Sequence, residues 1–270
     1  MRFFPSYKPS GKRRYLLGVA IGLFVSLFVS STVYSPAHIG HYAIPIPTLI
    51  PIIGHTSNPV APPSQTSNTQ ISSRAITPVF NHLNIVTTFF WVGEKASNDN
   101  GGIANTASTW DEQWQQHYGG VDSPSPRNGY YPAGFTPKEN PFYFALPYSD
   151  IDSHGNRKST AVKCPLAALK TSYSWCKNSW LAIRHNGKTI YAQWEDAGPF
   201  GEDDVNYVFG SSPPSNSQGE KAGLDVSPAV RDYLGLADVD KADWEFIDAG
   251  SVPNGPWKAI VTATTGESVD

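Results

Sequence analysis

Acidic side chains gather in one short stretch of this chain, residues 191–204, which reads YAQWEDAGPFGEDD. An aromatic run leads into Glu195 and Asp196, a Gly-Pro turn follows, and three more acids occupy positions 202–204. Carboxylates placed this closely repel one another, so a fold keeps them where water screens them or where a function uses them. One such function is proton transfer by a carboxyl group acting as a general acid or base.

Asp196 is the candidate general acid. The aromatic neighbours Trp194 and Phe200 and the charge on Glu195 are expected to raise the pKa of the Asp196 carboxyl, because desolvation and like charge disfavour the ionised form. Consecutive residues of a strand point to opposite faces. Glu195 is therefore a poor partner for Asp196 on one substrate bond, and we expect it to be solvated or paired with a Lys or Arg.

Aromatic side chains are numerous, with 8 Trp, 13 Tyr and 13 Phe in 270 residues. Such rings fill cores and also line sugar-binding grooves. The candidate platforms for stacking on a sugar are Trp91, Trp110, Trp194, Phe200 and Tyr207. Burial in the core is the commoner place for any one of them.

The sequence lacks the motifs that mark several other kinds of catalytic site. The chain has no Gly-x-Ser-x-Gly, no P-loop and no His-Glu-x-x-His. The acids at 202–204 are expected to form a solvated loop tip; calcium binding there stays open, although the spacing is not that of an EF-hand. A net charge of −3 and an excess of acids over residues 195–248 disfavour a nucleic-acid partner. We predict no cofactor and no metal site.

The elements that must position these residues are mostly strands. β-Branched and aromatic residues, which strands favour, predict strands at 84–94, 140–148, 180–185, 188–194, 223–227, 243–249 and 257–263. Asn186-Gly187 between two of these runs is a strong hairpin signal, because both residue types tolerate positive φ. Many short strands, few helices and long loops are typical of a β-barrel.

Two helices are predicted. The first covers residues 108–118. The second follows Ser227, which can accept a bond from an open backbone N–H group, and it begins at Pro228 and stops at Gly235.

The order of the motifs resembles the rare lipoprotein A-like family. Asp196-Ala197-Gly198-Pro199-Phe200 is similar to that family's Asp-Arg-Gly-Pro-Phe turn, and Leu224-Asp225-Val226-Ser227 is similar to its Ile-Asp-Leu-Ser segment. FALPY at 144–148 is similar to a Leu-Pro-Phe-Gly strand start. The resemblance covers roughly residues 140–248.

The resemblance implies a six-stranded double-psi β-barrel with an open groove across one face. Expansins, lytic transglycosylases of the MltA kind and one endoglucanase family look like relatives, and they bind or cut β-linked polysaccharides. Their Asp on the groove floor corresponds to Asp196. Gly198, Pro199 and Ser227 are assigned structural roles. Asp225 is expected to accept backbone N–H bonds in the turn before the helix, with catalysis as the alternative.

Two departures bear on function. Ala197 stands where the family has Arg, and Tyr143-Phe144-Ala145 stands where it has Ala-Ala-His. The expected function is binding or cleavage of a cell-wall polysaccharide, peptidoglycan above all, with Asp196 as acid. A non-catalytic, expansin-like glycan binder or a structural envelope protein is the alternative.

The N-terminal part of the sequence indicates where in the cell the protein is located. Residues 15–33 carry no charge and follow a basic patch. This length is close to that of a membrane-spanning helix, and the positive flank should stay in the cytoplasm. A cleavable signal peptide is the alternative. We expect an anchor at 1–35, a disordered Pro/Ser/Thr-rich linker at 36–83, the barrel domain at 84–264 and a tail at 265–270, with the barrel in the cell envelope or secreted.

Cys164 and Cys176 are the only cysteines. Thiols outside the cytoplasm tend to be oxidised, so a disulfide between them is expected. Such a bond would contribute about 3 kcal/mol by loop entropy. Two unpaired thiols are the alternative.

Overall fold

The computed structural model describes residues 77–98, 100–165 and 173–263. The predicted anchor, nearly all of the predicted linker and the predicted tail lie outside the described residues. Within the described part of the chain, no helix is long and apolar enough to cross a membrane.

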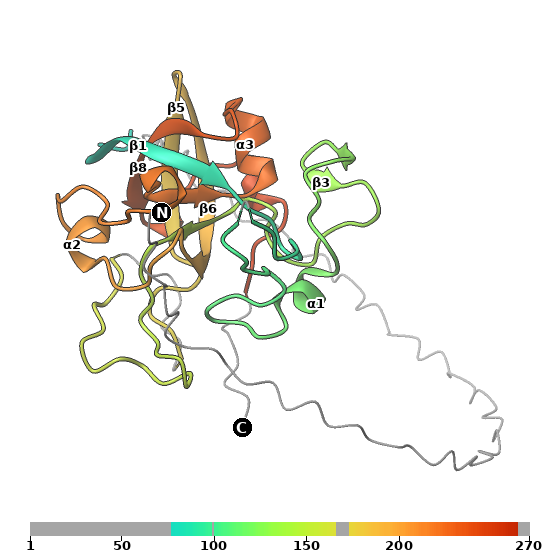
Figure 1. Ribbon diagram of the computed structural model, residues 1–270. Coiled ribbons are helices and arrows are strands. Elements are labelled where there is room, and N and C mark those ends of the chain that lie inside the picture. Colours follow the sequence, from blue (N-terminus) through green and yellow to red (C-terminus); the bar gives the residue numbers. More distant parts are fainter. Residues whose placement is uncertain (1–76, 99, 166–172, 264–270) are drawn as a thin grey trace, which may run out of the picture. The chain divides into compact units, whose positions relative to one another are not determined.

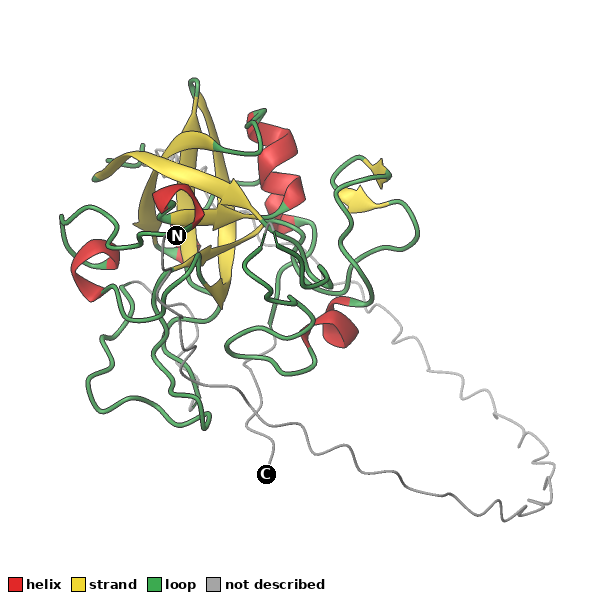
Figure 2. Ribbon diagram, viewed as in Figure 1, coloured by secondary structure: helices red, strands yellow, loops and turns green. Residues whose placement is uncertain are grey.

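Six strands close into a barrel (Figures 1 and 2). They are β1 (His82–Phe89), β4 (Tyr143–Leu146), β5 (Trp180–His185), β6 (Lys188–Ala197), β7 (Leu224–Val226) and β8 (Asp240–Ile247). Their order around the barrel is β1-β7-β4-β6-β5-β8, and β8 pairs with β1 to complete the ring. β1 runs parallel to β7 and β4 runs parallel to β6, while the other pairs are antiparallel.

The remaining elements are short and lie around this body (Figure 2). The α-helices are α1 (Trp114–Tyr118), α2 (Val205–Val208) and α3 (Pro228–Leu234), and the 3-10 turns are η1 (Gly219–Lys221), η2 (Ala249–Ser251) and η3 (Pro256–Lys258). A separate two-stranded sheet pairs β2 (Arg127–Asn128) with β3 (Tyr131–Pro132). The predicted mainly-β fold with few short helices is confirmed.

Local signals in the sequence determine the hairpin and the main helix. Asn186 and Gly187 have φ of 47° and 76° and join β5 to β6. The Ser227 hydroxyl accepts the Val230 N–H at 3.3 Å, and Gly235 ends α3 with a φ of 75°. Both predictions are confirmed.

Two predicted elements are wrong in whole or in part. Residues 257–263 do not form a strand: η3 turns there and buries Trp257. The barrel is already closed, so no strand edge is left to pair with this segment. Of the helix predicted at 108–118 only α1 forms, because the Asp111 carboxylate accepts the Gln113 N–H at 2.8 Å. Such local bonds compete with helix formation.

Alternate residues of β4 contribute to two apolar clusters. Phe144 and Leu146 belong to the larger one, which includes the barrel interior. Tyr143 and Ala145 point to the other side and pack with residues of the segment before β4, such as Phe90 and Trp114. Side chains from the segment between β1 and β4 therefore cover the outer face of β4, and the candidate site lies between this segment and the barrel.

Cys164 and Cys176 form a disulfide, as predicted. The bond joins the loop after β4 to the segment that leads into β5.

Candidate functional site

A cavity of about 930 Å³ lies on the outer side of the barrel. One wall comes from the end of β1 and the chain that follows it, and the other comes from the turn after β6 and from η1. We call this cavity the groove. Its lining residues are Thr88, Phe89, Phe90, Trp91, Gly93, Glu94, Lys95, Ser97, Asn100, Ile103, Asn105, Val121, Ala145, Asp196, Ala197, Gly198, Pro199, Phe200, Gly219, Glu220, Asp225, Asp238 and Val239.

Two carboxylates flank one small residue on the groove floor. Ala145 of β4 is in register with Asp196 of β6 on one side and with Asp225 of β7 on the other. Residues in register on neighbouring strands point to the same face. With strands about 4.8 Å apart, the two Asp Cα atoms are separated by about 10 Å. Ala145 has only a methyl group, so the space between the two acids stays open.

A β-bulge aims Asp196 at this face. Phe144 pairs with Trp194, but the next residue, Ala145, pairs with Asp196, so Glu195 is the extra residue. Without it, strict alternation would place Asp196 on the same side as Trp194, which lies in the larger cluster. Bulges re-aim side chains in this way, often beside functional sites. Sequence patterns alone do not reveal the bulge.

Burial raises the pKa of Asp196 to about 7, opposed by hydrogen bonds to the carboxyl. Its Oδ1 accepts the backbone N–H groups of Thr109 and Ala197, each at 2.8 Å. The like charge that adds to the rise is that of Glu202, rather than the predicted Glu195. The elevated pKa leaves Asp196 protonated over much of the range in which a general acid must donate.

Burial also raises the pKa of Asp225 to about 7, and the charges of Glu94 and Asp196 add to the effect. The Thr88 side chain and the Val226 backbone amide oppose the rise. The Oδ1 atom of Asp225 is buried and accepts no hydrogen bond. The acceptance of backbone N–H bonds by Asp225 in the turn before α3 stays a prediction, whereas Ser227 caps α3 as expected.

Glu94 is a third groove acid, and it was not predicted. Burial raises the pKa of its carboxyl, and hydrogen bonds from Asn100 and Asn105 oppose the rise. The Asn105 amide donates to Oε2 at 2.8 Å. The sequence feature that could have identified Glu94 is its position directly after the aromatic run that begins in β1.

Glu195 has no place in the groove. Its side chain is buried and lies 2.5 Å from the ammonium of Lys177, which is also buried. The prediction of a basic partner is confirmed, and the alternative of a solvated side chain is wrong. Burial raises the pKa of Glu195, which Lys177 opposes.

Only part of the predicted aromatic set reaches the groove. Trp91 and Phe200 line it, together with Phe89 and Phe90, which were not predicted. Trp110, Trp194 and Tyr207 are fully buried, so their prediction as stacking platforms is wrong. They serve the core because each packs against other rings; the Trp110 and Trp194 rings, for example, lie 5.6 Å apart.

Phe200 depends on glycine to reach its position. A Cβ atom built on Gly219 would lie 2.2 Å from Cε2 of Phe200, and one on Gly101 would lie 2.7 Å from Cε1. The turn before Phe200 contains the predicted Gly198 and Pro199, and the Gly198 N–H donates to the Leu146 carbonyl at 2.9 Å. The turn is thereby fixed to the end of β4.

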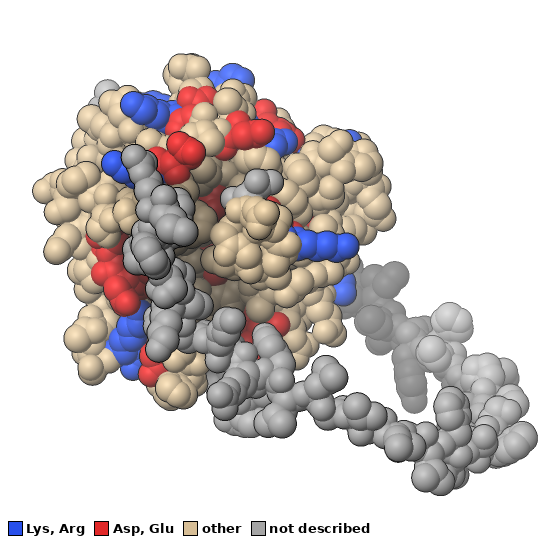
Figure 3. Space-filling view, in the orientation of Figure 1, with Lys and Arg blue, Asp and Glu red and all other residues tan. Residues whose placement is uncertain are grey.

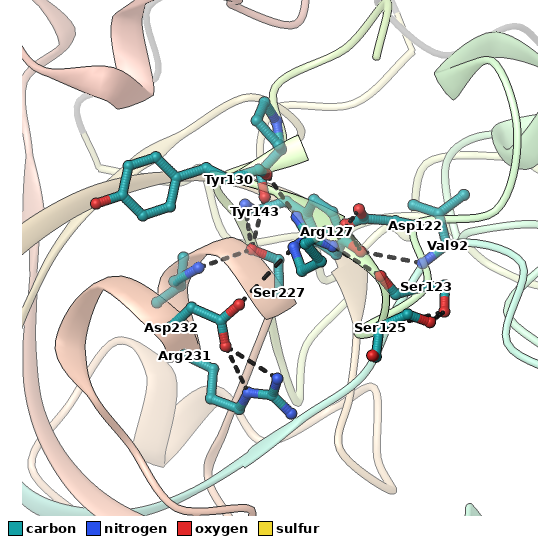
Figure 4. A network of polar contacts seen from close by, with 12 residues as sticks. Val92, Asp122, Ser123, Ser125, Arg127, Tyr130, Tyr143, Ser227, Arg231 and Asp232 are labelled. Atoms are coloured by element: carbon teal, nitrogen blue, oxygen red, sulfur yellow. Dashed lines mark hydrogen bonds and ion pairs between the residues drawn. The ribbon is translucent and has the colours of Figure 1, made fainter. Parts of the chain in front are cut away.

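A polar network holds the first wall of the groove against the barrel (Figure 4). The Tyr143 hydroxyl accepts the Val92 N–H at 3.0 Å and donates to Asp122 Oδ2 at 2.9 Å. Arg127 donates to Asp122 Oδ1 at 2.8 Å and to the Tyr130 carbonyl. The backbone that carries Phe90 and Trp91 is therefore tied to β4 through buried groups.

The groove is acidic with an apolar rim. Glu94, Asp196, Glu220, Asp225 and Asp238 line it against one base, Lys95. Ile103, Val121 and Val239 also line it and are among the exposed large apolar residues. In the space-filling view, acidic atoms are visible around and inside a central hollow (Figure 3). Among the described residues, no group of acids, His or Cys has the arrangement of a metal site.

No family model matches the chain, and no curated protein matches it. One solved structure to which the chain is similar is that of the Streptomyces papain inhibitor, at 13% sequence identity and a TM-score of 0.25, over 61% of this chain and 93% of that one. A similarity at this level carries no argument about function.

Proposed function

We propose that this chain binds and cleaves a cell-wall glycan, most simply peptidoglycan, with Asp196 as the general acid. The observation that carries the proposal is the pair of carboxyls, buried Asp196 and half-buried Asp225, on either side of Ala145 on the floor of an aromatic-lined groove. Most enzymes that hydrolyse glycosidic bonds use a pair of carboxyl groups.

The surroundings of each carboxyl indicate which one donates a proton and which one accepts it. Asp196, held by two backbone N–H groups, protonates the leaving oxygen of the glycosidic bond. Asp225, which lines the groove on the other side of Ala145, then accepts a proton from the attacking nucleophile. That nucleophile is either water or a hydroxyl of the sugar itself, as in lytic transglycosylases. A protonated acid and an ionised base operating together give a bell-shaped pH dependence of the rate.

We further propose that the barrel is a double-psi β-barrel of the rare lipoprotein A-like family. Support comes from the closed six-strand ring with two parallel pairs, β1 with β7 and β4 with β6. The two motifs of the resemblance also supply the two groove acids, Asp196 and Asp225.

A non-catalytic glycan binder, expansin-like or structural, is the second candidate. The observation that favours it is Ala145, which leaves no basic side chain between the two acids. Ala197 likewise supplies no charge to the groove.

The proposed location is the cell envelope, outside the cytoplasm. The disulfide supports it, because such bonds persist in oxidising compartments. The charge-free segment at 15–33 behind a basic patch supports a membrane anchor or a signal peptide.

The test is digestion of purified peptidoglycan with mass detection of released fragments. Wild type should release them, and anhydro-sugar ends would identify a lytic transglycosylase. Asp196→Asn should reduce release by about 10²–10⁴-fold, the usual contribution of a general acid, and should retain pull-down on insoluble wall. Wall binding without any release would favour the binder. Release that persists in Asp196→Asn would remove Asp196 from the mechanism.

A further inference from the structure

Glu195 and Asp196 compete for one position in the barrel. In the observed register Asp196 lies opposite Ala145, because a bulge at Glu195 follows the pair formed by Phe144 and Trp194. Without the bulge, the residue opposite Ala145 would be Glu195 itself. A one-residue slip of this kind changes which side chain reaches a given face. Both residues are acids, so polarity alone does not select Asp196 for the groove floor.

A buried lysine holds Glu195 away from the floor. The Lys177 ammonium lies 2.5 Å from Oε2 of Glu195, and the two side chains are only 0% and 1% exposed. An ion pair that is removed from water in this way is costly to break, because each charge loses its partner. The pair therefore favours the register in which Glu195 is the bulge residue.

The backbone beside Lys177 is fixed to the same part of β6. The Asn178 N–H donates to the Trp194 carbonyl at 2.9 Å, and the Trp194 N–H donates to the Ser179 carbonyl at 2.8 Å. The Lys177 N–H itself donates to the Ser174 hydroxyl at 3.0 Å. The lysine side chain therefore starts from a backbone that is anchored next to the bulge.

We propose that Lys177 is a positioning residue for the general acid: by binding Glu195 it fixes the register in which Asp196 reaches the groove floor. The inference rests on the proposed function and adds to it a residue that does not itself line the groove. A buried ion pair is often no more stabilising than apolar residues of similar volume, and setting a register is the best-attested reason for keeping one.

The test compares Lys177→Met with Lys177→Met/Glu195→Met. In the single variant Glu195 has lost its cation and can take the place opposite Ala145. In the double variant two apolar side chains replace the ion pair, so only Asp196 suits the polar floor. The nuclear Overhauser contacts of Ala145 report the register directly. We expect contacts with residue 196 in wild type and the double variant, and with residue 195 in most molecules of the single variant.

Activity and binding should respond differently. Release of peptidoglycan fragments should fall by about 10²-fold in Lys177→Met, the typical effect of a misplaced catalytic group, and should return in the double variant. Pull-down on insoluble wall should stay unchanged in both variants, because neither Lys177 nor Glu195 lines the groove.

Arg127→Met is the matched control. It also removes the cation of a buried ion pair, but the partner is Asp122, which lies outside β6. Ala145 should therefore keep its contact with Asp196 in this variant. A shifted register in Arg127→Met would mean that the loss of any buried ion pair disturbs the barrel, and it would overturn the inference.

Two further outcomes overturn the inference. One is a folded Lys177→Met in which Ala145 still contacts only Asp196. The other is a double variant as displaced as the single one, because the missing lysine and not a competing acid would then be responsible. If Lys177→Met does not fold, Lys177→Gln replaces it, with both Ala145 contacts expected and contact with Asp196 alone overturning the inference. An inactive wild type counts against the proposed function, while the Ala145 contacts still decide the role of Lys177.

Discussion

Asp196 and Asp225 occupy equivalent places on opposite sides of Ala145. Each is in register with that residue, one through the parallel pairing of β6 with β4 and the other through the antiparallel pairing of β7 with β4. Asp196 and Asp225 are 29 positions apart in the sequence. Closure of the barrel brings them to one floor, where burial raises the pKa of both carboxyls.

The first prediction concerns stability and pH. The folded-state pKa values of Asp196 and Asp225 are raised from 3.8 to about 7, so the folded state binds more protons than the unfolded state between these values. The free energy of unfolding therefore falls as pH rises from about 4 to about 7. Glu195 contributes in the same direction.

Asp225→Asn should remove part of this slope. We expect the variant to be more stable than wild type at pH 8 by on the order of 1–4 kcal/mol, since one pKa unit corresponds to 1.36 kcal/mol, and similar to wild type near pH 3. Urea unfolding at a series of pH values measures both. An unchanged slope in the variant would show that Asp225 ionises normally in the folded protein.

The second prediction concerns Phe200. In Gly219→Ala the new Cβ would meet the Phe200 ring at 2.2 Å, so the ring must leave its place in the groove. We expect glycan affinity to fall by roughly tenfold or more, about 1.4 kcal/mol. Pull-down on insoluble wall or calorimetry measures it.

Gly187→Ala is the control for the second prediction. Gly187 also has a positive φ, 76°, but a Cβ atom built on it would have no neighbouring atom within 4 Å. The substitution should cost backbone strain of about 1 kcal/mol without affecting binding. Equal loss of affinity in both variants would mean that strain, and not the Phe200 ring, is responsible.

The third prediction concerns the wall of the groove. Arg127 and Asp122 form an ion pair at 2.8 Å with side chains only 6% and 0% exposed. Arg127→Met leaves the Asp122 carboxylate buried without its partner, which typically costs about 3–5 kcal/mol. Thermal or urea unfolding measures the loss.

The double variant Arg127→Met/Asp122→Asn should recover part of that stability, because the unpaired charge is gone while the Tyr143 hydroxyl keeps an acceptor. If the double variant is less stable than Arg127→Met alone, the cost arises from lost packing and not from an unpaired charge.

Much of the fold could be predicted from local signals. Asn186-Gly187 marks the hairpin and Ser227 with Gly235 delimits α3, because backbone dihedrals and caps are set by near neighbours. The strand predicted at 257–263 does not form. Strand propensity is a property of the segment alone, whereas a strand also needs a free sheet edge to pair with, and the closed barrel offers none.

The site was predictable only in part. Asp196 was located through its motif, but its orientation depends on the bulge at Glu195, which only the pairing with β4 defines. Trp194 and Asp196 are two positions apart, yet one lies in the core and the other in the groove. Glu94 belongs to the site through contacts between distant segments, which no local pattern records.

The fourth prediction concerns the disulfide. Cys164 and Cys176 close a loop with a sequence separation of 12, so Cys164→Ser/Cys176→Ser should lower the free energy of unfolding by about 3 kcal/mol. The groove is lined by other segments, so glycan binding below the melting transition should persist. Urea unfolding and wall pull-down test the two parts, and a loss of binding in the folded variant would contradict the second.

The most direct test of the central claim is NMR titration of the Asp196 and Asp225 side-chain carboxyls in the ligand-free protein. The two acids that flank Ala145 should each titrate near pH 7. Asp225→Asn should shift the Asp196 midpoint little or slightly downward, because one like charge is removed. Midpoints at or below about 3.9, the value of a freely solvated Asp, would contradict the account.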